Sequence, residues 1–311
     1  MFLKVAVSSL LSRKGSAIMT LMAISVAIFV LLGIEQIRQQ ARDSFASTVS
    51  GVDLIVGAKT GSLNLLLYSV FRIGSPTDNI SWQAYRDIAD SDDVAWAIPI
   101  SLGDSHEGYR VVGTTQAFFE HFSFGKKRSL AFFEGEAFEG TFDAVLGSEV
   151  ASALGYSVGT EIILAHGLAS TSFTKHDNQP FVVVGVLAAT GTPVDQTIHV
   201  RLEGIEAMHA GGSTVQIGAF ATANPPPTDF LEPESITAFM LGLKSRMSTF
   251  NVQRQINQFA GEPLMAILPG VALSELWQMM SMFENVLRLI SALVLLAAVL
   301  GMGAVLLASI R

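Results

Sequence analysis

The sequence predicts a membrane protein of the α+β class, in which two transmembrane helices flank one large folded domain. Two observations support this prediction. Uncharged apolar runs lie near both ends of the chain, at 16–34 and 289–310, and the block between them is acidic, with mixed helix and strand patterns. At 1.5 Å per residue the first run is about 28 Å long as a helix, close to the hydrocarbon thickness of a bilayer.

Charge is distributed unevenly along the 311 residues. All 27 acidic residues lie between Glu35 and Glu284, three basic residues precede the first apolar run, and Arg288 and Arg311 flank the second. The middle block therefore holds 14 basic residues against 27 acidic ones, a net charge of −13. Because basic flanks stay in the cytoplasm, both termini are predicted to be cytoplasmic and the block extracytoplasmic. Such an acidic block is a poor nucleic-acid binder.

The N-terminal region begins with a predicted cytoplasmic interfacial helix at 1–15, and transmembrane helix 1 follows at 16–34. A frayed tail is the alternative for the first segment. The basic start also fits a cleaved signal peptide. However, the apolar run exceeds the usual length of about 7–15 residues and no A-x-A site follows promptly. An uncleaved anchor is therefore the favoured interpretation.

Both apolar runs continue into the block as amphipathic helices, at 35–49 and 271–288. Their apolar residues recur at three- and four-residue spacing, which places them on one helix face. We expect a stalk in which each helix covers the other; packing on the domain core alone is the alternative. The predicted stalk packing residues are Ile37, Ala41 and Phe45 on the first helix, and Leu276, Met280, Phe283 and Leu287 on the second.

Residues 52–122 and 214–268 each show strand–helix–strand character. In the first stretch, Ser81 can cap a helix at 82–89, and 61–74 has the composition of a loop. The two stretches together predict one domain built from sequence-distant halves on a small antiparallel α+β sheet. The expected elements are strands at 52–56, 94–100, 109–113, 215–221, 236–243 and 265–268, and helices at 116–122 and 247–259.

Residues 125–210 form a β-rich piece between these halves and are predicted to be an inserted subdomain. Ser148 can cap a helix that Gly155 ends in the manner of a C-cap glycine. The other elements expected here are strands at 161–164, 181–187 and 197–201, a helix at 202–209 and a hairpin loop at 166–180.

Two segments partly match known catalytic motifs but lack the features that those motifs require. Gly155–Gly159 matches G-x-S-x-G, yet it follows a helix and precedes a strand, the reverse of a nucleophile elbow. Gly51–Thr60 resembles a phosphate-binding loop but has an alanine between glycine and lysine. The chain has no cysteine, and its six histidines lack metal-ligand spacing. We therefore predict no catalytic, cofactor-binding or metal site.

The second apolar run carries small residues at four-residue intervals, a spacing that lets helices approach closely in membranes. This predicts a helix-packing face for a partner helix. The residues concerned are Ala297, Gly301, Ala304 and Ala308.

Four stretches spread over the block resemble the MacB/FtsX-type ABC transporter permeases, including the lipoprotein-releasing and DevC-like members. The motifs are structural, so they indicate the family well and the substrate poorly. The stretches are Asp53–Lys59 (DLIVGAK), Ala144–Gly159 (AVLGSEVASALGYSVG), Val182–Asp195 (VVVGVLAATGTPVD) and Ile198–His209 (IHVRLEGIEAMH).

The resemblance implies a porter-like subdomain split into 50–124 and 212–270, with a β-rich subdomain at 125–211 inserted and both carried on a stalk. It implies a non-catalytic permease subunit in the bacterial inner membrane, paired as a homodimer or heterodimer, with a separate cytoplasmic ABC ATPase. ATP hydrolysis would drive motion of the periplasmic domain, exporting or extracting a lipoprotein, peptide or small amphiphile. A periplasmic adaptor, an outer-membrane channel and membrane lipids are further possible partners.

The sequence departs from the family in one respect. The family has four spans, whereas this sequence supplies two, so spans three and four are expected to be lost by truncation or supplied separately. The alternative function is a two-span sensor or a chain-length regulator with a periplasmic ligand-binding domain. A sensor would need a cytoplasmic output domain, and regulators carry long helical ectodomains rather than a strand-rich block.

Overall fold

The computed structural model describes residues 14–48, 50–166, 180–214 and 232–310. The chain divides into two compact units. We call Met1–Asp43 with Glu275–Arg311 the helical unit, and Ser44–Ser274 the sheet unit.

Two long helices supply the helical unit, α2 (Lys14–Ser47) and α9 (Pro269–Ile310). Each is one element over the residues predicted as a span and a stalk helix, because neither segment contains an internal proline. Among the described residues, Pro269–Gly301 is the one helical stretch long and apolar enough to cross a membrane by length and composition. The apolar stretch of α2, Ile24–Ile37, is shorter.

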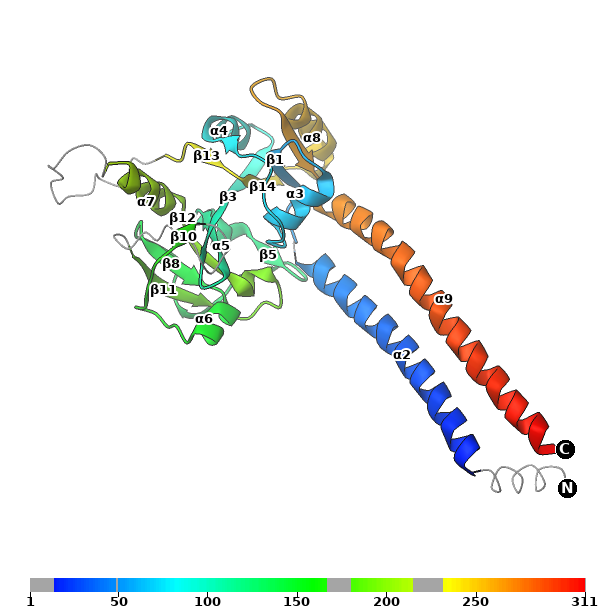
Figure 1. Ribbon diagram of the computed structural model, residues 1–311. Coiled ribbons are helices and arrows are strands. Elements are labelled where there is room, and N and C mark those ends of the chain that lie inside the picture. The colour runs from blue at the N-terminus through cyan, green and yellow to red at the C-terminus, as the bar shows by residue number, and fades with distance from the viewer. Residues whose placement is uncertain (1–13, 49, 167–179, 215–231, 311) are drawn as a thin grey trace. The chain divides into compact units, whose positions relative to one another are not determined.

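The sheet unit contains short helices and strands in alternation (Figure 1). Its strands are β1 (Leu54–Ala58), β2 (Ile80–Ser81), β3 (Val94–His106), β4 (Tyr109–Thr114), β5 (Ser123–Phe124), β6 (Arg128–Ser129), β7 (Phe132–Gly135), β8 (Asp143–Leu146), β9 (Glu161–Ile162), β10 (Ala165–His166), β11 (Phe181–Leu187), β12 (Thr197–Arg201), β13 (Ser235–Ile236), β14 (Ala238–Leu243) and β15 (Leu264–Ile267). Its helices are α3 (Ser62–Ser69), α4 (Trp82–Ala89), α5 (Ala117–His121), α6 (Ser148–Leu154), η1 (Pro193–Gln196), α7 (Leu202–Thr214), η3 (Arg246–Ser248) and α8 (Thr249–Asn257).

Most strands join one sheet of order β15-β1-β14-β3-β4-β12-β8-β11-β7. The long strand β3 joins the two halves of this sheet: Val94–Ile100 pairs with β14, and Ser101–His106 pairs with β4. The sheet is mixed, because β4 with β12 and β8 with β11 run parallel. The antiparallel sheet predicted for the halves 52–122 and 214–268 is confirmed, because their strands β1, β3, β4, β14 and β15 pair antiparallel. Each parallel pair includes a strand of the piece at 125–210, whose crossovers are long enough for parallel pairing.

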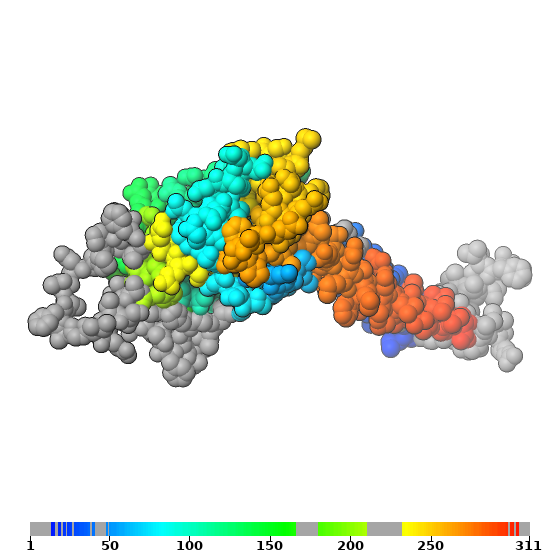
Figure 2. Space-filling view, turned by 90° about the horizontal axis from the view of Figure 1, so that it is seen from above, coloured from blue at the N-terminus to red at the C-terminus, as the bar shows by residue number. Residues whose placement is uncertain are grey.

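Segments far apart in the sequence pair closely in the sheet unit. β1 lies between β14 and β15, and β2 pairs with β13. Figure 2 shows the same neighbourhood, with the cyan segment around residues 80–90 beside the yellow and orange segment from 235 to 268. The sheet continues without a break through β4, past the boundary expected between residues 124 and 125.

β1 is buried on both faces, which explains its unbroken apolar sequence. Leu54 and Val56 pack in one core cluster with Phe239, whereas Ile55 packs in a second cluster with Phe118. Successive residues of a strand point to opposite faces, so each face of β1 faces its own core. A third cluster covers the β8–β11–β12 region.

Local signals predicted several helix ends correctly. α4 spans the expected residues, and the Ser81 side chain accepts a hydrogen bond from Ala84 N at 3.2 Å. Gly155 ends α6 with φ +69°. The Ser148 cap was wrong, since Gly147 is the N-cap and Ser148 is the first helical residue.

The assignment of 61–74 to a loop was also wrong, because Ser62–Ser69 forms α3. Its run of leucines supports a helix of two turns that buries Leu65 and Leu66. Other predictions fall on residues outside the described ranges: most of the interfacial helix at 1–15, most of the hairpin loop at 166–180 and the strand at 215–221.

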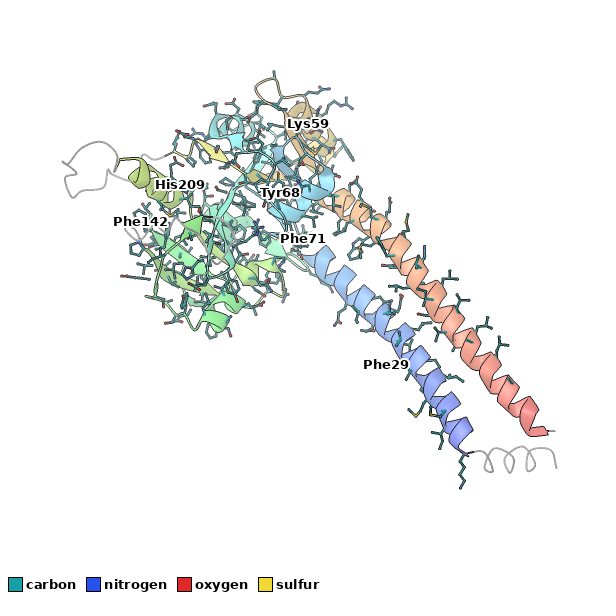
Figure 3. The ribbon with its side chains drawn as sticks, in the orientation of Figure 1. Phe29, Lys59, Tyr68, Phe71, Phe142 and His209 are labelled. Atoms are coloured by element: carbon teal, nitrogen blue, oxygen red, sulfur yellow. The ribbon has the colours of Figure 1, made fainter. Side chains whose placement is uncertain are left out.

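Tyr68 on α3, labelled in Figure 3, is fully buried against β1. Its hydroxyl lies 2.8 Å from the place a Cβ on Gly57 would occupy, so the glycine makes room for it. That hydroxyl has no hydrogen-bond partner among the described residues, and burial raises the pKa of Tyr68 to about 12.

We expect Tyr68→Phe to stabilise the sheet unit by about 1 kcal/mol, because it removes a buried hydroxyl without a partner. The melting temperature should rise by roughly 2–4 °C. The matched control is Tyr156→Phe, which removes the hydrogen bond between Tyr156 Oη and His106 Nε2 at 3.1 Å and should lower it. Thermal unfolding of the purified full-length chain measures both melting temperatures. A lower melting temperature for Tyr68→Phe would show that the Tyr68 hydroxyl does have a hydrogen-bond partner and would contradict the prediction.

Candidate functional site

The sheet unit connects to both long helices through two adjacent strands. The chain leaves α2 and enters β1 within a few residues, and β15 leads directly into α9 at Pro269. β1 and β15 pair antiparallel, with Ile55 opposite Ile267 and Ala58 opposite Leu264. We call residues 48–58 and 264–274 the junction.

The incoming half of the junction is fixed by hydrogen bonds to two other segments. Ser50 N donates to the Ser123 carbonyl at 3.0 Å. Asp53 holds β14 twice: its amide donates to Leu241 O at 2.9 Å, and its carboxylate accepts from Leu243 N at 2.8 Å. This explains the aspartate of the DLIVGAK stretch, which anchors the start of β1.

The outgoing half is fixed by burial. Pro269 begins α9, a position where proline is favoured because its missing N–H would have no helical partner. Ala272 is 1% exposed and packs in the same cluster as Phe71 and Ile267. The first turn of α9 therefore packs on the domain core through Ala272, whereas Val271 of the same turn is exposed.

A tight turn after β11 holds the signature stretch that ends at Asp195. The carboxylate accepts hydrogen bonds from Thr190 N at 2.9 Å, Thr190 Oγ1 at 2.8 Å and Gly191 N at 2.7 Å. The Asp195 side chain is buried, so the aspartate is structural. The backbone of Val194 and Asp195 packs against Gly147, which places the turn beside the N-terminus of α6.

His199 on β12 is fully buried, and neither of its ring nitrogens has a hydrogen-bond partner among the described residues. Its ring stacks on Phe118 at 4.7 Å between centroids. Burial, assisted by the positive charge of Arg72, lowers the pKa of His199 to about 3. The ring is therefore neutral at physiological pH and serves packing and not proton transfer.

We predict that His199 makes the sheet unit acid-sensitive. The pKa of His199 in the folded state lies below the ordinary value of 6.5. The contribution of the neutral ring to the free energy of unfolding is therefore complete above pH 6.5 and is lost as the pH falls towards 3. The expected slope is about 1.4 kcal/mol per pH unit in that window. Urea unfolding between pH 7 and 4 should show a flatter profile for His199→Leu than for wild type. The exposed-residue control His121→Gln should keep the wild-type slope, and equal slopes for His199→Leu and wild type would contradict the prediction.

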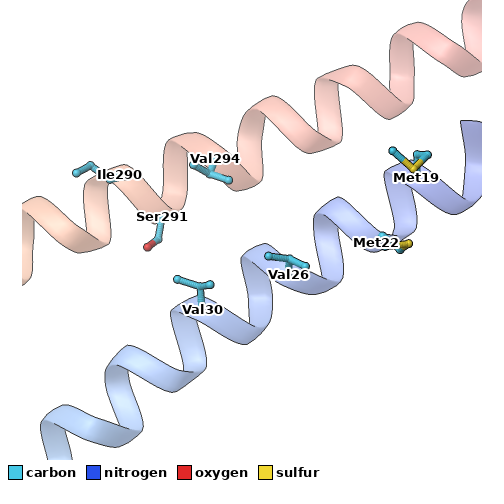
Figure 4. A pocket seen from close by; sticks show the side chains of 7 residues that line it. All are labelled: Met19, Met22, Val26, Val30, Ile290, Ser291 and Val294. Carbon is cyan, nitrogen blue, oxygen red and sulfur yellow. The ribbon is translucent and has the colours of Figure 1, made fainter.

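In the helical unit, α2 and α9 line an apolar groove of about 600 Å³ (Figure 4). Arg288 Nη2 lies 3.3 Å from Glu35 Oε2, an ion pair between the two helices at residues flanking the predicted spans. Ser291 is the polar member of the groove lining. The lining residues are Met19, Met22, Val26 and Val30 on α2, and Ile290, Ser291 and Val294 on α9. Sequence reasoning missed them, although the 3–4–4 spacing on α2 was a usable signal.

The predicted packing residues lie elsewhere on these helices. Leu276 is partly buried, whereas Ile37, Met280, Phe283 and Leu287 are exposed. Ala297, Gly301 and Ala304 are exposed as well. The side chains of Ala41, Phe45 and Ala308 lie outside the described ones. Mutual packing of the stalk faces and a small-residue helix contact therefore stay predictions.

Among the described residues, no group of three or more histidine, aspartate or glutamate side chains could hold a metal ion. Within the sheet unit, the described structure instead offers a hydrogen-bonded strand, β1, paired with β15, which leads into the first turn of α9.

Comparison with known proteins gives one family. A family model described as the MacB-like periplasmic core domain matches residues 17–259. Among solved structures, the periplasmic region of MacB from Actinobacillus actinomycetemcomitans aligns at 8% identity and TM-score 0.45, covering 74% of this chain and 94% of that one. The extracellular domain of the noncanonic ABC-type transporter YknZ from Gram-positive bacteria aligns at 11% identity and TM-score 0.38, covering 70% and 98%. No curated protein sequence matches the chain.

Proposed function

The chain belongs to the family of MacB-like periplasmic core domains, as its motifs predicted, and we propose that it is the membrane subunit of a MacB/FtsX-type ABC transporter. The match over residues 17–259 is the observation that supports this most strongly. The family is one of ABC transporter permease subunits, which are generally non-catalytic. In this proposal ATP hydrolysis belongs to a separate cytoplasmic ATPase.

The proposed topology places the sheet unit in the periplasm of a bacterium, with both termini in the cytoplasm. Helix segments 16–34 and 289–310 would cross the inner membrane. The apolar character of Pro269–Gly301 and the confinement of all acidic residues to the middle of the chain support this arrangement. Basic residues at 4, 13 and 14 would hold the N-terminus inside.

The proposed mechanism is mechanical coupling. The stalk segments 35–49 and 271–288 would transmit motion from the ATPase to the junction, where β1 and β15 lie side by side. The porter-like halves 50–124 and 212–270 and the inserted subdomain 125–211 would then move to extract or export a lipoprotein, peptide or small amphiphile. Because Ala272 is part of the core, a shift of α9 would pull on the sheet.

A dimer is the proposed working form, either of two copies or with a related permease. Ala297, Gly301 and Ala304 are exposed small residues at four-residue spacing, and they would suit a close contact with a second membrane helix. The exposed stalk residues Met280 and Phe283 would face a partner protein or membrane lipids. A periplasmic adaptor or an outer-membrane channel would complete the assembly.

Co-purification of the tagged full-length gene product in mild detergent tests this proposal, with quantitative mass spectrometry of what accompanies it. A stoichiometric ABC-type ATPase, absent from a parallel purification of an unrelated tagged membrane protein, is the expected result. Recovery of a kinase-like or polymerase partner without any ATPase would contradict the permease assignment and favour a sensor or chain-length regulator.

A further inference from the structure

Two arginines of the sheet unit, Arg72 and Arg110, donate hydrogen bonds to one short segment, 69–74, which comprises the last residue of α3 and the turn that follows it. Arg72 Nη1 donates to the Ser69 carbonyl. Arg110, on β4, donates through Nη2 to the Gly74 carbonyl at 2.5 Å. Both side chains are partly buried and partly open to solvent. A strand and a loop distant from it in sequence thus bring two guanidinium groups to carbonyls five residues apart, near enough for the charge of Arg110 to act on Arg72.

Within the described ranges, neither guanidinium lies in an ion pair. Other arginines form ion pairs: Arg86 Nη1 lies 2.9 Å from Glu232 Oε1, and Arg201 Nε lies 3.3 Å from Glu203 Oε2. The contrast is informative because acidic residues outnumber basic ones by 27 to 19 in this chain. At Arg72 and Arg110 the hydrogen-bond acceptors are neutral carbonyls, which leave the positive charge uncompensated.

The backbone at Arg72 supports a role for its side chain. Its φ of +59° lies in the left-handed region, which glycine adopts freely and other residues rarely do. Burial and the nearby charge of Arg110 lower the pKa of Arg72 to about 9, so its surroundings disfavour the charged form. A bound anion would reverse that effect, since an opposite charge stabilises a guanidinium.

We propose that Arg72 and Arg110 together bind a phosphate group, supplied either as free phosphate or as the phosphodiester of a lipid headgroup. Guanidinium groups form planar, bidentate hydrogen bonds with phosphate oxygens, and each arginine here has N–H groups beyond the one that its carbonyl partner uses. A tetrahedral phosphate can accept hydrogen bonds from two arginines at once. The proposal stands apart from the transport role, because it depends only on these two side chains and their segment.

Isothermal titration calorimetry of the full-length chain in a non-ionic detergent tests the site with two probes, inorganic phosphate and glycerophosphoglycerol. Arg72→Gly removes one guanidinium while giving the backbone the residue best suited to φ +59°, so its melting temperature should equal or exceed that of wild type. Arg110→Gln removes the other. The matched control is Arg246→Gln, an exposed arginine with no ion pair among the described residues.

We expect each of Arg72→Gly and Arg110→Gln to weaken binding about tenfold or more, the loss of one charge-assisted contact, and Arg246→Gln to stay within about twofold of wild type. Tighter binding of inorganic phosphate identifies free phosphate as the source, and tighter binding of glycerophosphoglycerol identifies a lipid headgroup. Failure of wild type to bind either probe at millimolar concentration overturns the proposal. So does wild-type affinity in the well-folded Arg72→Gly variant.

Discussion

Replacing Gly147 by alanine is expected to destabilise the sheet unit by about 3 kcal/mol, the largest effect of a single added methyl group that we predict. A Cβ at this position would lie 2.3 Å from Val194 O and 2.4 Å from Asp195 O. Both atoms are backbone, and the Asp195 carboxylate fixes that turn through hydrogen bonds to Thr190 and Gly191. The turn cannot move away from an added methyl group without breaking these hydrogen bonds. The clash therefore lowers the free energy of unfolding of the sheet unit.

The backbone of Gly147 separates a steric effect from a conformational one. Its φ of −67° and ψ of 152° suit any residue, so an alanine is excluded by contact and not by dihedral angle. Gly61 is the matched control. It is also a helix N-cap, with φ −80° and ψ 145°, and a Cβ there would meet nothing within 4 Å. Thermal unfolding should show a large drop for Gly147→Ala and a small one for Gly61→Ala; equal drops would refute the steric explanation.

These glycines also show what could be predicted from the sequence. The helix ending at Gly155 and the cap at Ser81 follow from short-range chemistry, and both were correct. The identity of the N-cap at Gly147 was not predictable, because a serine is normally the better cap. Only the backbone of Val194 and Asp195, distant in sequence, explains why a glycine stands there.

In the sheet too, contacts between residues distant in sequence could not be predicted from local patterns. The two sequence-distant halves were evident from their repeated strand–helix–strand pattern. The role of β3 was not, because a sequence pattern does not reveal that one strand pairs with β14 over its first half and with β4 over its second. α3 was missed because Leu65 and Leu66 are adjacent, with no polar residue between them to mark a helix face. The pairing of Arg72 and Arg110 at one segment also depends on tertiary structure alone.

The second large effect concerns coupling and follows from the proposed function. Asn285→Pro in α9 is expected to abolish transport while the ATPase partner keeps hydrolysing ATP. Proline removes one backbone hydrogen bond and clashes with the preceding turn, which costs about 3 kcal/mol in a helix interior and kinks it. Asn285 is exposed, and α9 runs from Pro269 to Ile310 as one helix, so the substitution alters the helix backbone and little else.

Asn285→Ala is the matched control, because it shortens the same side chain and preserves the helix. The assay reconstitutes the chain with its ATPase in vesicles and measures ATP hydrolysis and substrate release in parallel. In this proposal a stiff α9 is needed because its first turn packs through Ala272 in the same core cluster as Ile267 of β15, so a kink would absorb the motion before it reaches the junction. Transport at the wild-type rate in Asn285→Pro would mean that α9 only anchors the domain, and that the force enters through α2.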